Sequence, residues 1–550
     1  MIPPGNNPSG ATEQAPLPSD YQALSDEVKA LRESISLGEK EISELQAENE
    51  RLSAQVQWLK RQAKLEQSRR FGTSSEKAHG LQREIFNEAE HLVSQSGESS
   101  EDDSVTVPAH TRKKRPRTPT VPDDLVREIV VHEMEASEQI CPHDQATLKA
   151  IGHDIRRELK IIPEQVWAVE HRYVNYTCPC CDRSIKSTPR EARISQGLCS
   201  PQAAAAVATN KYVDHLPLYR QSERFSRAGV SIDRGTLGRW MIQHGEASQP
   251  LVNLLQDGVQ HYPYQQLDET TVKVLKTQNK RKNKSKGAHQ GYLWVQRGGP
   301  PDKPVILYHY DPTRSGDVAR RLLADYEGCV QTDGYPAYVG VMADLKLTHA
   351  LCNVHARRKF ADILKSSRDS NDQRVRHAEV AIDYYKQLYR IEAELRETRD
   401  QSEHQQWYQD RLERRRLQSR PIFDEMIQWA DDLLHRVAPK TDLGEALGYL
   451  VKHQTGLAVF LDNGIVEMDT NGVENRIRPV ALGRRNWLFS DTEHGVRASA
   501  NLYTLINTAM LNGHNPYAYL VHIFKELPKA GSVDEFESLL PWNVAPDTLE

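Results

Sequence analysis

The strand-type segment that begins near residue 262 constrains the fold of this chain more than any other feature. Its first strand alternates so that Asp268 shares a face with Val272 and Val274. Its last strand ends directly before Asp333, in the turn sequence Asp-Gly-Tyr-Pro. The expected elements are strands over 265–275, 291–296 and 304–310, a helix over 315–326 and a strand over 329–332, with a basic loop over 276–287 that closes the first hairpin.

Three antiparallel strands, a helix and a further strand are the opening of a ribonuclease H-like α/β domain. In that architecture, carboxylates on the first and fourth strands, here Asp268 and Asp333, lie side by side at the centre of the sheet. Two carboxylates held close together repel each other unless a divalent cation lies between them. Mg²⁺ prefers carboxylate and water oxygens, and two such ions would stabilise both oxygens of a phosphodiester displacement. The pattern therefore predicts a cation site with phosphoryl chemistry.

A third acid from elsewhere in the chain would complete this site, and Glu474 is the candidate. It lies on an expected helix whose apolar side carries Val473 and Ile477. Glu474 could instead pair with Arg478 four residues on. The chain has 76 acidic residues, so rivals exist; they are Glu269, Asp462, Glu467 and Asp469. Arginines near Glu474 that suit phosphate oxygens are Arg476, Arg478, Arg484 and Arg485.

The N-terminal part predicts self-association. Residues 1–20, rich in Pro, Gly, Asn and Ser, are expected to be disordered. A heptad repeat follows within 21–70, with leucines at one core position and mostly β-branched residues at the other, which favours a parallel two-stranded coiled coil. Asn49 falls at a core position, where a buried amide fixes register. The alternative is one amphipathic helix packed on its own protein. Residues 71–121 read as a linker.

Residues 122–198 predict a small β-rich module shaped like a zinc ribbon. Strands are expected over 156–162 and 165–176. A Cys-x-x-Cys turn directs two thiolates at one tetrahedral ion, but the first half-site here reads Cys-Pro-His-Asp. The alternative is a metal-free module that keeps the ribbon shape. The candidate zinc ligands are Cys141, His143, Asp144, Cys178 and Cys181.

Residues 199–260 read as consecutive helices with helix-turn-helix spacing. A helix over 217–228 is followed by Gly229 in the turn, and Ser231 is expected to cap a second helix that continues through His244. Many three-helix clusters do not bind DNA, so the alternative is a purely structural cluster. The residues that the second helix would offer to a DNA groove are Arg234, Thr236 and Arg239.

The net charge of −5 gives no general indication of a nucleic-acid binder, so any DNA contact must come from local basic clusters. Such runs are most often solvated surface. Further along, His349, Cys352 and His355 recur every three residues and could line one side of a helix, where ordinary packing is favoured over metal binding. The clusters considered as DNA-binding are Lys280, Arg281 and Lys282, and then Arg357, Arg358 and Lys359.

Composition also bears on the compartment. The longest apolar stretch is too short to cross a bilayer, and the N-terminus lacks the pattern of a secretory signal. Three of the seven cysteines crowd into residues 178–181, which suggests metal binding in a reducing compartment rather than a disulfide framework. These features predict a cytoplasmic protein without membrane association.

Taken together, the motifs of this chain resemble those of the insertion-sequence-66 family of transposases over nearly its whole length. The matching blocks are Arg70–Lys77, Tyr212–Gln221, Asp268–Thr270, Thr332–Tyr335, Cys352–Phe360 and Ile477–Phe489. The resemblance implies a multidomain α+β protein and a DDE enzyme that cleaves and transfers DNA strands. In it, Asp268, Asp333 and Glu474 match the acidic triad, with Mg²⁺ or Mn²⁺ as cofactor.

The resemblance further implies a helical insertion between the second and third acids. The expected boundaries are a first core part over 261–366, the insertion over 367–445, a second core part over 446–510 and a C-terminal tail region over 511–550. The implied partners are the element-end inverted repeats, target DNA and small accessory proteins of the same element. The implied location is a bacterial cytoplasm, in association with the nucleoid.

One departure concerns the zinc-ribbon-like module. The family pattern begins with Cys-x-x-Cys, whereas this chain has Asp144 at the second position. Zinc would then be held by thiolates together with His143 or Asp144, or not at all. The alternative function for the whole chain is a catalytically inactive, transposase-derived protein that binds DNA or regulates.

Overall fold

The computed structural model describes residues 28–29, 48, 165–173, 175–177, 185–187, 189–279, 284–286, 288–366, 372–399 and 403–545. Apart from Val28, Lys29 and Glu48, which are helical, the coiled coil predicted over 21–70 lies outside the described residues. The linker predicted over 71–121 lies outside them as well. Other predicted sites outside the described residues are Cys141, His143, Asp144, Cys178, Cys181, Lys280, Arg281 and Lys282.

The chain divides into two units, and the smaller one includes a short hairpin. Its strands β1 (Asn175–Thr177) and β2 (Ile185–Ser187) pair antiparallel. The strand predicted over 165–176 is wrong for most of its length, because residues 165–173 adopt no regular secondary structure. Trp167 and Val169 are 76% and 67% exposed, so the apolar side chains of the alternating pattern are not buried as a strand face requires.

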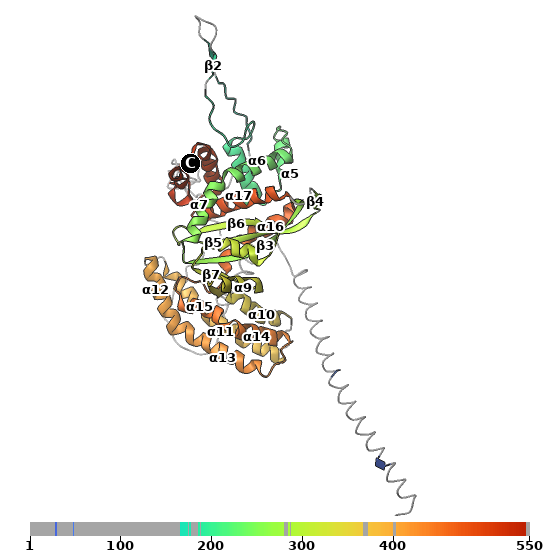
Figure 1. The fold of residues 1–550 in the computed structure, drawn as a ribbon, viewed down its shortest axis with the longest axis vertical. Helices are drawn as coiled ribbons and strands as arrows, with labels where there is room; N and C mark the ends of the chain where they lie inside the picture. Colours follow the sequence, from blue (N-terminus) through green and yellow to red (C-terminus); the bar gives the residue numbers. More distant parts are fainter. Residues whose placement is uncertain are drawn as a thin grey trace, which may run out of the picture. The chain divides into compact units, whose positions relative to one another are not determined.

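The larger unit is built on a mixed sheet with β3 at its centre (Figure 1). The order of its main strands is β6-β5-β3-β7-β8. β3 pairs antiparallel with β5 and parallel with β7, and the short strands β4 and β9 also pair with β3. The predicted strands over 265–275, 291–296, 304–310 and 329–332 are confirmed. Their bounds are β3 Tyr264–Asn279, β4 Lys284–Lys286, β5 His289–Gly298, β6 Val305–Asp311, β7 Cys329–Thr332, β8 Thr348–Leu351 and β9 Ser490–Thr492.

One face of this sheet is covered by α8 (Gly316–Leu322) and α9 (Pro336–Asp344). Leu267 and Val330 of the strands form a buried cluster there with Val318 of α8. The helix predicted over 315–326 ends at Leu322, earlier than expected.

Two further helices, α16 (Asn471–Trp487) and α17 (Glu493–Leu511), contact β3 and β6 respectively (Figure 1). The backbone N–H groups of Ile306 and Tyr308 in the edge strand β6 donate to the hydroxyls of Thr508 and Thr504 of α17, over 3.2 and 2.9 Å. An edge strand presents unpaired backbone groups, and α17 satisfies two of them.

Within the insertion predicted over 367–445, the described residues are mostly helical, and these helices gather beyond β7 (Figure 1). Their apolar faces form one buried cluster with β8 and α10, which includes Leu351, Phe360, Tyr385 and Leu447. The bounds are α10 Asn353–Ser366, α11 Gln373–Glu397, α12 His404–Arg414, the π-helical turn η3 Arg415–Ser419, α13 Arg420–Leu434, α14 Asp442–Lys452 and α15 Gln454–Asp462.

The helices expected over 199–260 are present. α6 begins after Asp233, whose carboxylate accepts from the backbone N–H of Gly235 and Thr236, so Asp233 and not Ser231 caps it. Within the described part of the chain, no helix has both the length and the apolar composition needed to span a bilayer. The bounds are α4 Pro201–Tyr212, α5 Leu218–Arg227, α6 Arg234–Ala247 and α7 Gln249–Gln260.

Within the C-terminal tail region predicted over 511–550, residues 516–543 fold into short helices. Helix α18 contacts α4, and the ring of Phe524 lies 4.5 Å from that of His244. Burial of the apolar side of α18 explains why this segment folds: Tyr519, Leu520 and Ile523 are fully buried. The elements are α18 Pro516–Glu526, η4 Leu527–Lys529, α19 Val533–Ser538 and η5 Pro541–Asn543.

Candidate active site

Asp268 and Asp333 stand at matching positions of neighbouring strands. β3 and β7 run parallel with Gln266 opposite Gln331; Asp268 follows two residues on within β3, and Asp333 follows two residues on, directly after the end of β7. Residues two apart in a strand share a face. Gly334 has a φ of 82°, a value that favours glycine, in the turn between β7 and α9. The backbone N–H of Tyr335 donates to Asp333 Oδ1 over 2.9 Å.

Glu474 lies in the first turn of α16 and is 6% exposed. The hydroxyl of Thr470, directly before that helix, donates to Glu474 Oε1 over 3.0 Å. Two basic side chains of α10 approach the same carboxylate: His355 Nδ1 is 3.7 Å from Oε1, and Arg358 Nη2 is 3.7 Å from Oε2. Burial lowers the pKa of His355, although the charge of Glu474 opposes this shift.

Asp333 and Glu474 both act electrostatically on Asp268. The pKa of Asp268 is raised well above its ordinary value, first by burial and then by the negative charges of Glu269, Glu474 and Asp333. The N–H of Glu269, which donates to Asp268 Oδ1 over 2.7 Å, offsets this only in part. Carboxylates gathered in this way provide the hard oxygen donors that Mg²⁺ and Mn²⁺ prefer. The three carboxylates are thus of the donor type that a divalent cation takes, although among the described residues the ligand atoms that lie within 4.8 Å of one another are those of Cys352, His355 and Glu474.

The first rival acid, Glu269, points to the opposite face of the sheet, as neighbouring strand residues do. Its carboxylate accepts from Arg314 Nε and from the hydroxyl of Tyr338. The guanidinium of Arg314 in turn lies over the ring of Tyr335, 4.0 Å from its centroid. Burial raises the pKa of Glu269, although Tyr338 and Arg314 act against the shift. Glu269 therefore has partners of its own on that face.

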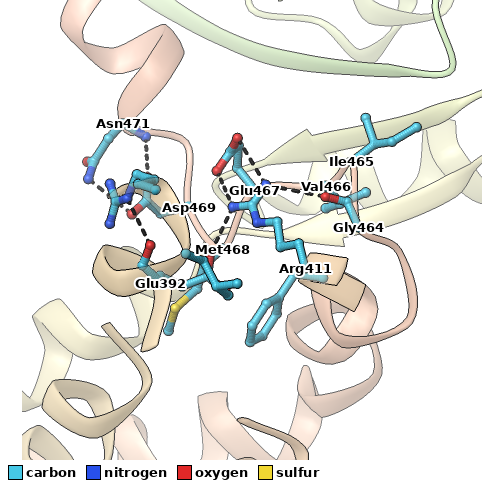
Figure 2. Close-up of polar contacts among 12 residues, drawn as sticks. Glu392, Arg411, Gly464, Ile465, Val466, Glu467, Met468, Asp469 and Asn471 are labelled. Atoms are coloured by element: carbon cyan, nitrogen blue, oxygen red, sulfur yellow. Dashed lines mark hydrogen bonds and ion pairs between the residues drawn. The ribbon is translucent and has the colours of Figure 1, made fainter. Parts of the chain in front are cut away.

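The other rival acids also have partners. Asp462 pairs with Arg420, and Glu467 accepts from Arg411 Nη2 over 2.7 Å. Asp469 accepts from the backbone N–H of Asn471 over 2.9 Å; Figure 2 shows these last two carboxylates. Burial raises the pKa of Asp469 to about 7.

His349, Cys352 and His355 do not line one helix face as predicted, because His349 lies in β8 and His355 in α10. Cys352 and His355 nevertheless lie close to Glu474: one ligand atom from each of the three residues falls within 4.8 Å of the others. The thiol of Cys352 is fully buried, and burial raises its pKa to about 12, so it is protonated at neutral pH. Its sulfur accepts from the backbone N–H of Thr470 over 3.3 Å.

Two arginines proposed to bind DNA are used inside the protein. Arg357 is 2% exposed, which contradicts its assignment as a DNA contact. Arg484 donates through Nη1 to the hydroxyl of Thr270, over 3.0 Å, and to both oxygens of Thr271, over 2.7 Å each, and thereby ties α16 to β3. In both basic runs, one arginine side chain faces the protein interior rather than solvent.

The other described DNA candidates keep surface access. Arg358 and Lys359 lie on α10, half-buried and exposed respectively. On α6, Arg234 and Arg239 are exposed, and Arg239 Nη2 donates to Thr236 Oγ1 over 2.9 Å. The candidates on α16 are half-buried Arg476 and Arg478 and exposed Arg485.

Thr470 was not singled out from the sequence. A hydroxyl residue four positions before an acid at a helix start can reach that acid's side chain, and this spacing is the signal that could have found it.

Four family models match the chain. They are described as "Transposase IS66 family" over residues 196–498, "IS66 C-terminal element" over 504–542, "zinc-finger binding domain of transposase IS66" over 138–182 and "Transposase C of IS166 homeodomain" over 58–130. The zinc-finger match contains the predicted zinc-ribbon-like cysteines. The homeodomain match covers the end of the predicted coiled coil, the predicted linker over 71–121 and the first residues of the predicted zinc-ribbon-like module.

Relatives in Sinorhizobium fredii (strain NBRC 101917 / NGR234) are similar over most of the chain. The uncharacterized protein y4jD is 31% identical, with 78% of this chain and 82% of the relative covered. For the uncharacterized protein y4hP the identity is 30%, with 80% and 78% covered. Among solved structures, the Drosophila P element transposase strand transfer complex aligns with this chain with a TM-score of 0.30 and 10% identity. The alignment covers 58% of this chain and 94% of that one. This likeness is too weak to bear on the fold. The family model that spans residues 196–498, more than half of the chain, and the relatives at 30% identity or above establish that this chain belongs to the IS66 transposase family.

Proposed function

We propose that the protein is a DDE transposase that cleaves DNA at the ends of its insertion sequence and transfers the freed strands to a target. The observation that carries the proposal is that the β7 end and the first turn of α16 bring Asp333 and Glu474 near enough for their charges to act on buried Asp268 in β3. The strand order β6-β5-β3-β7-β8, antiparallel on one side of β3 and parallel on the other, supports a ribonuclease H-like core.

Asp268, Asp333 and Glu474 would hold Mg²⁺ or Mn²⁺ through their carboxylate oxygens. When bound, these ions supply Lewis-acid stabilisation to the attacking and leaving oxygens of a phosphodiester displacement. Thr470 fixes the carboxylate of Glu474 by its hydrogen bond. Arg358, whose side chain is 40% exposed beside Glu474, would bind a phosphate oxygen of the scissile strand.

The proposed reaction has two displacements at the same site. First, the oxygen of a water molecule bonds to the scissile phosphorus and the bond to the 3′ oxygen breaks, which leaves a 3′-hydroxyl and a 5′-phosphate. The 3′-hydroxyl oxygen then bonds to a phosphorus of the target strand, and the 3′ oxygen of that strand leaves. The three acids hold the reacting groups in line in both steps.

The remaining sequence predictions belong to this proposal. The zinc-finger region would hold Zn²⁺ and, with α6, bind the terminal inverted repeats. The N-terminal segment would pair two copies as a coiled coil, and small accessory proteins of the element would assist. The proposed DNA contacts are Arg234, Thr236, Arg239, Lys280, Arg281, Lys282, Arg358, Lys359, Arg476, Arg478 and Arg485.

The test is a mobility-shift and cleavage assay on a duplex that carries the DNA flanking the protein's own gene, with and without Mg²⁺. We expect salt-sensitive binding and Mg²⁺-dependent cleavage. Asp333→Asn and Glu474→Gln should still bind the duplex but cleave it about a thousandfold more slowly, a loss of several kcal/mol of transition-state stabilisation.

Asp462→Asn is the matched control, because Asp462 is an exposed acid of the same segment and pairs with Arg420. It should cleave at the wild-type rate. DNA binding without cleavage by the wild-type protein would favour a catalytically inactive, DNA-binding relative. Cleavage that survives both acid substitutions would remove the proposed triad.

A further inference from the structure

Two buried glutamines precede two of the candidate acids in the sequence, each by two residues. Gln266 in β3 and Gln331 in β7 are opposite each other and at most 1% exposed. They precede Asp268 and Asp333 by two residues, so they share the face that carries these acids. Gln266 Nε2 donates to Gln331 Oε1 over 3.0 Å.

Both amides bind the backbone of the segment that leads to Glu474. Gln331 Nε2 donates to the carbonyl oxygen of Glu467 over 2.8 Å, and Gln266 Nε2 donates to that of Asp469 over 2.8 Å. Gln266 Oε1 accepts from the backbone N–H of Val473 over 3.1 Å. The two strands that carry Asp268 and Asp333 thus hold the third acid's segment at three points.

Gly472 lies against the ends of two long side chains, which would have to shift to admit a Cβ there. A Cβ at Gly472 would lie 2.7 Å from Gln266 Oε1 and 2.8 Å from Arg297 Nη1. Gly472 therefore lets the first turn of α16 approach the amide of Gln266 closely.

We propose that Gln266 and Gln331 are positioning residues that set the place of Glu474 relative to Asp268 and Asp333, and so the affinity of the acid cluster for a divalent cation. The proposal rests on the proposed function, since it assigns a cation to the same three acids. Groups that orient metal ligands from behind typically change metal affinity or activity 10- to 100-fold when they are removed.

The strand supplies a matched control. Gln265 is also fully buried, and its Oε1 accepts from Gln296 Nε2 over 2.8 Å. It points to the opposite face of β3, away from the segment of Glu474. Gln265→Met therefore removes a buried amide of the same strand and leaves the acid cluster alone.

The experiment compares the full-length wild-type protein with Gln266→Met and Gln265→Met. Mn²⁺ binding is measured by calorimetry, Mg²⁺ dependence by cleavage of the flanking-DNA duplex, and folding by the thermal midpoint Tm. We expect both variants to lower Tm, Gln266→Met by more, because the Gln266 amide makes more hydrogen bonds than that of Gln265. Only Gln266→Met should weaken Mn²⁺ binding and raise the half-maximal Mg²⁺ concentration, each about 10- to 100-fold.

If Gln266→Met does not fold, Gly472→Ala takes its place, because alanine favours a helix while its Cβ displaces the Gln266 amide. It should weaken Mn²⁺ binding in the same way. Wild-type metal dependence in either variant, or an equal loss in Gln265→Met, would overturn the positioning role. A wild-type protein that neither binds Mn²⁺ nor cleaves would instead overturn the proposed function, so the two failures are distinguishable.

Discussion

The helical insertion and the candidate active site both contain buried carboxylates, but the pKa values of these carboxylates shift in opposite directions. In the insertion, Glu392 is 2% exposed and accepts from Arg415 Nε and from Arg411 Nη2, each over 2.7 Å. Burial alone would raise the pKa of Glu392, yet the two arginines outweigh it and hold the pKa at about 2. The pKa of Asp268 moves the other way, because the charges that act on it after burial are those of other carboxylates.

This contrast separates two uses of buried charge. In the insertion, the charge of buried Glu392 is neutralised by the arginines Arg411 and Arg415. Arg415 Nη1 also donates to the carbonyl oxygens of Phe460 and Val466, over 2.9 and 2.8 Å. These bonds connect η3 to the end of α15 and the loop after it. Figure 2 shows the adjoining contact of Arg411 with Glu467. At the sheet, burial and the neighbouring carboxylates instead both oppose ionisation of Asp268, which costs stability and is consistent with the proposed cation site.

The largest expected effect comes from breaking the insertion's network. Arg415→Met leaves Glu392 buried with one arginine fewer and removes the contacts to the loop after α15, so the free energy of unfolding should fall by about 3 kcal/mol or more. Denaturant titration measures it. The control is Arg414→Met, whose exposed pair with Glu394 should change stability by no more than about 0.5 kcal/mol. Equal losses in the two variants would mean that the buried network does not support the fold.

A smaller effect is expected from pH. The pKa of Glu392 is depressed from 4.5 to about 2, so its ionic stabilisation is fully present above pH 4.5 and is lost as pH falls toward 2. The difference in Tm between wild type and Glu392→Gln should therefore be constant above pH 4.5 and shrink below it. A difference that does not change over this range would show that the carboxylate charge is not what the arginines stabilise.

The smallest effect has the opposite sign and concerns the acid cluster. Without divalent cations, Asp268→Asn removes one of the repelling charges and should raise stability by about 1 kcal/mol, or Tm by roughly 2 °C. Differential scanning calorimetry in a chelating buffer measures this. Asp491→Asn, which loses an exposed pair with Lys276, should not raise Tm. A lower Tm for Asp268→Asn would mean that the carboxylate is already compensated within the protein, and the contrast with the insertion would disappear.

The strands of the central sheet were predictable from the sequence, because the alternation around Asp268 and the short apolar run before Asp333 are local patterns. It could not foretell that Gln266 and Gln331 face each other, since strand register depends on contacts between residues 65 positions apart in the chain. The alternating pattern over 165–173 predicted a strand that the structure does not contain. A local pattern shows which residues could share a face, but it does not show whether another part of the protein packs against that face. Likewise, the basic run at 357–359 does not reveal that its first arginine faces inward.

The threonine hydroxyls of α17 have a consequence for assembly. Because Thr504 and Thr508 already occupy backbone N–H groups of β6, a second copy of the chain cannot add a strand there and continue the sheet. In the proposed pairing of two copies on DNA, the contacts between them would therefore form through side-chain surfaces or through other segments. Such contacts can be rearranged during a reaction without opening the fold itself.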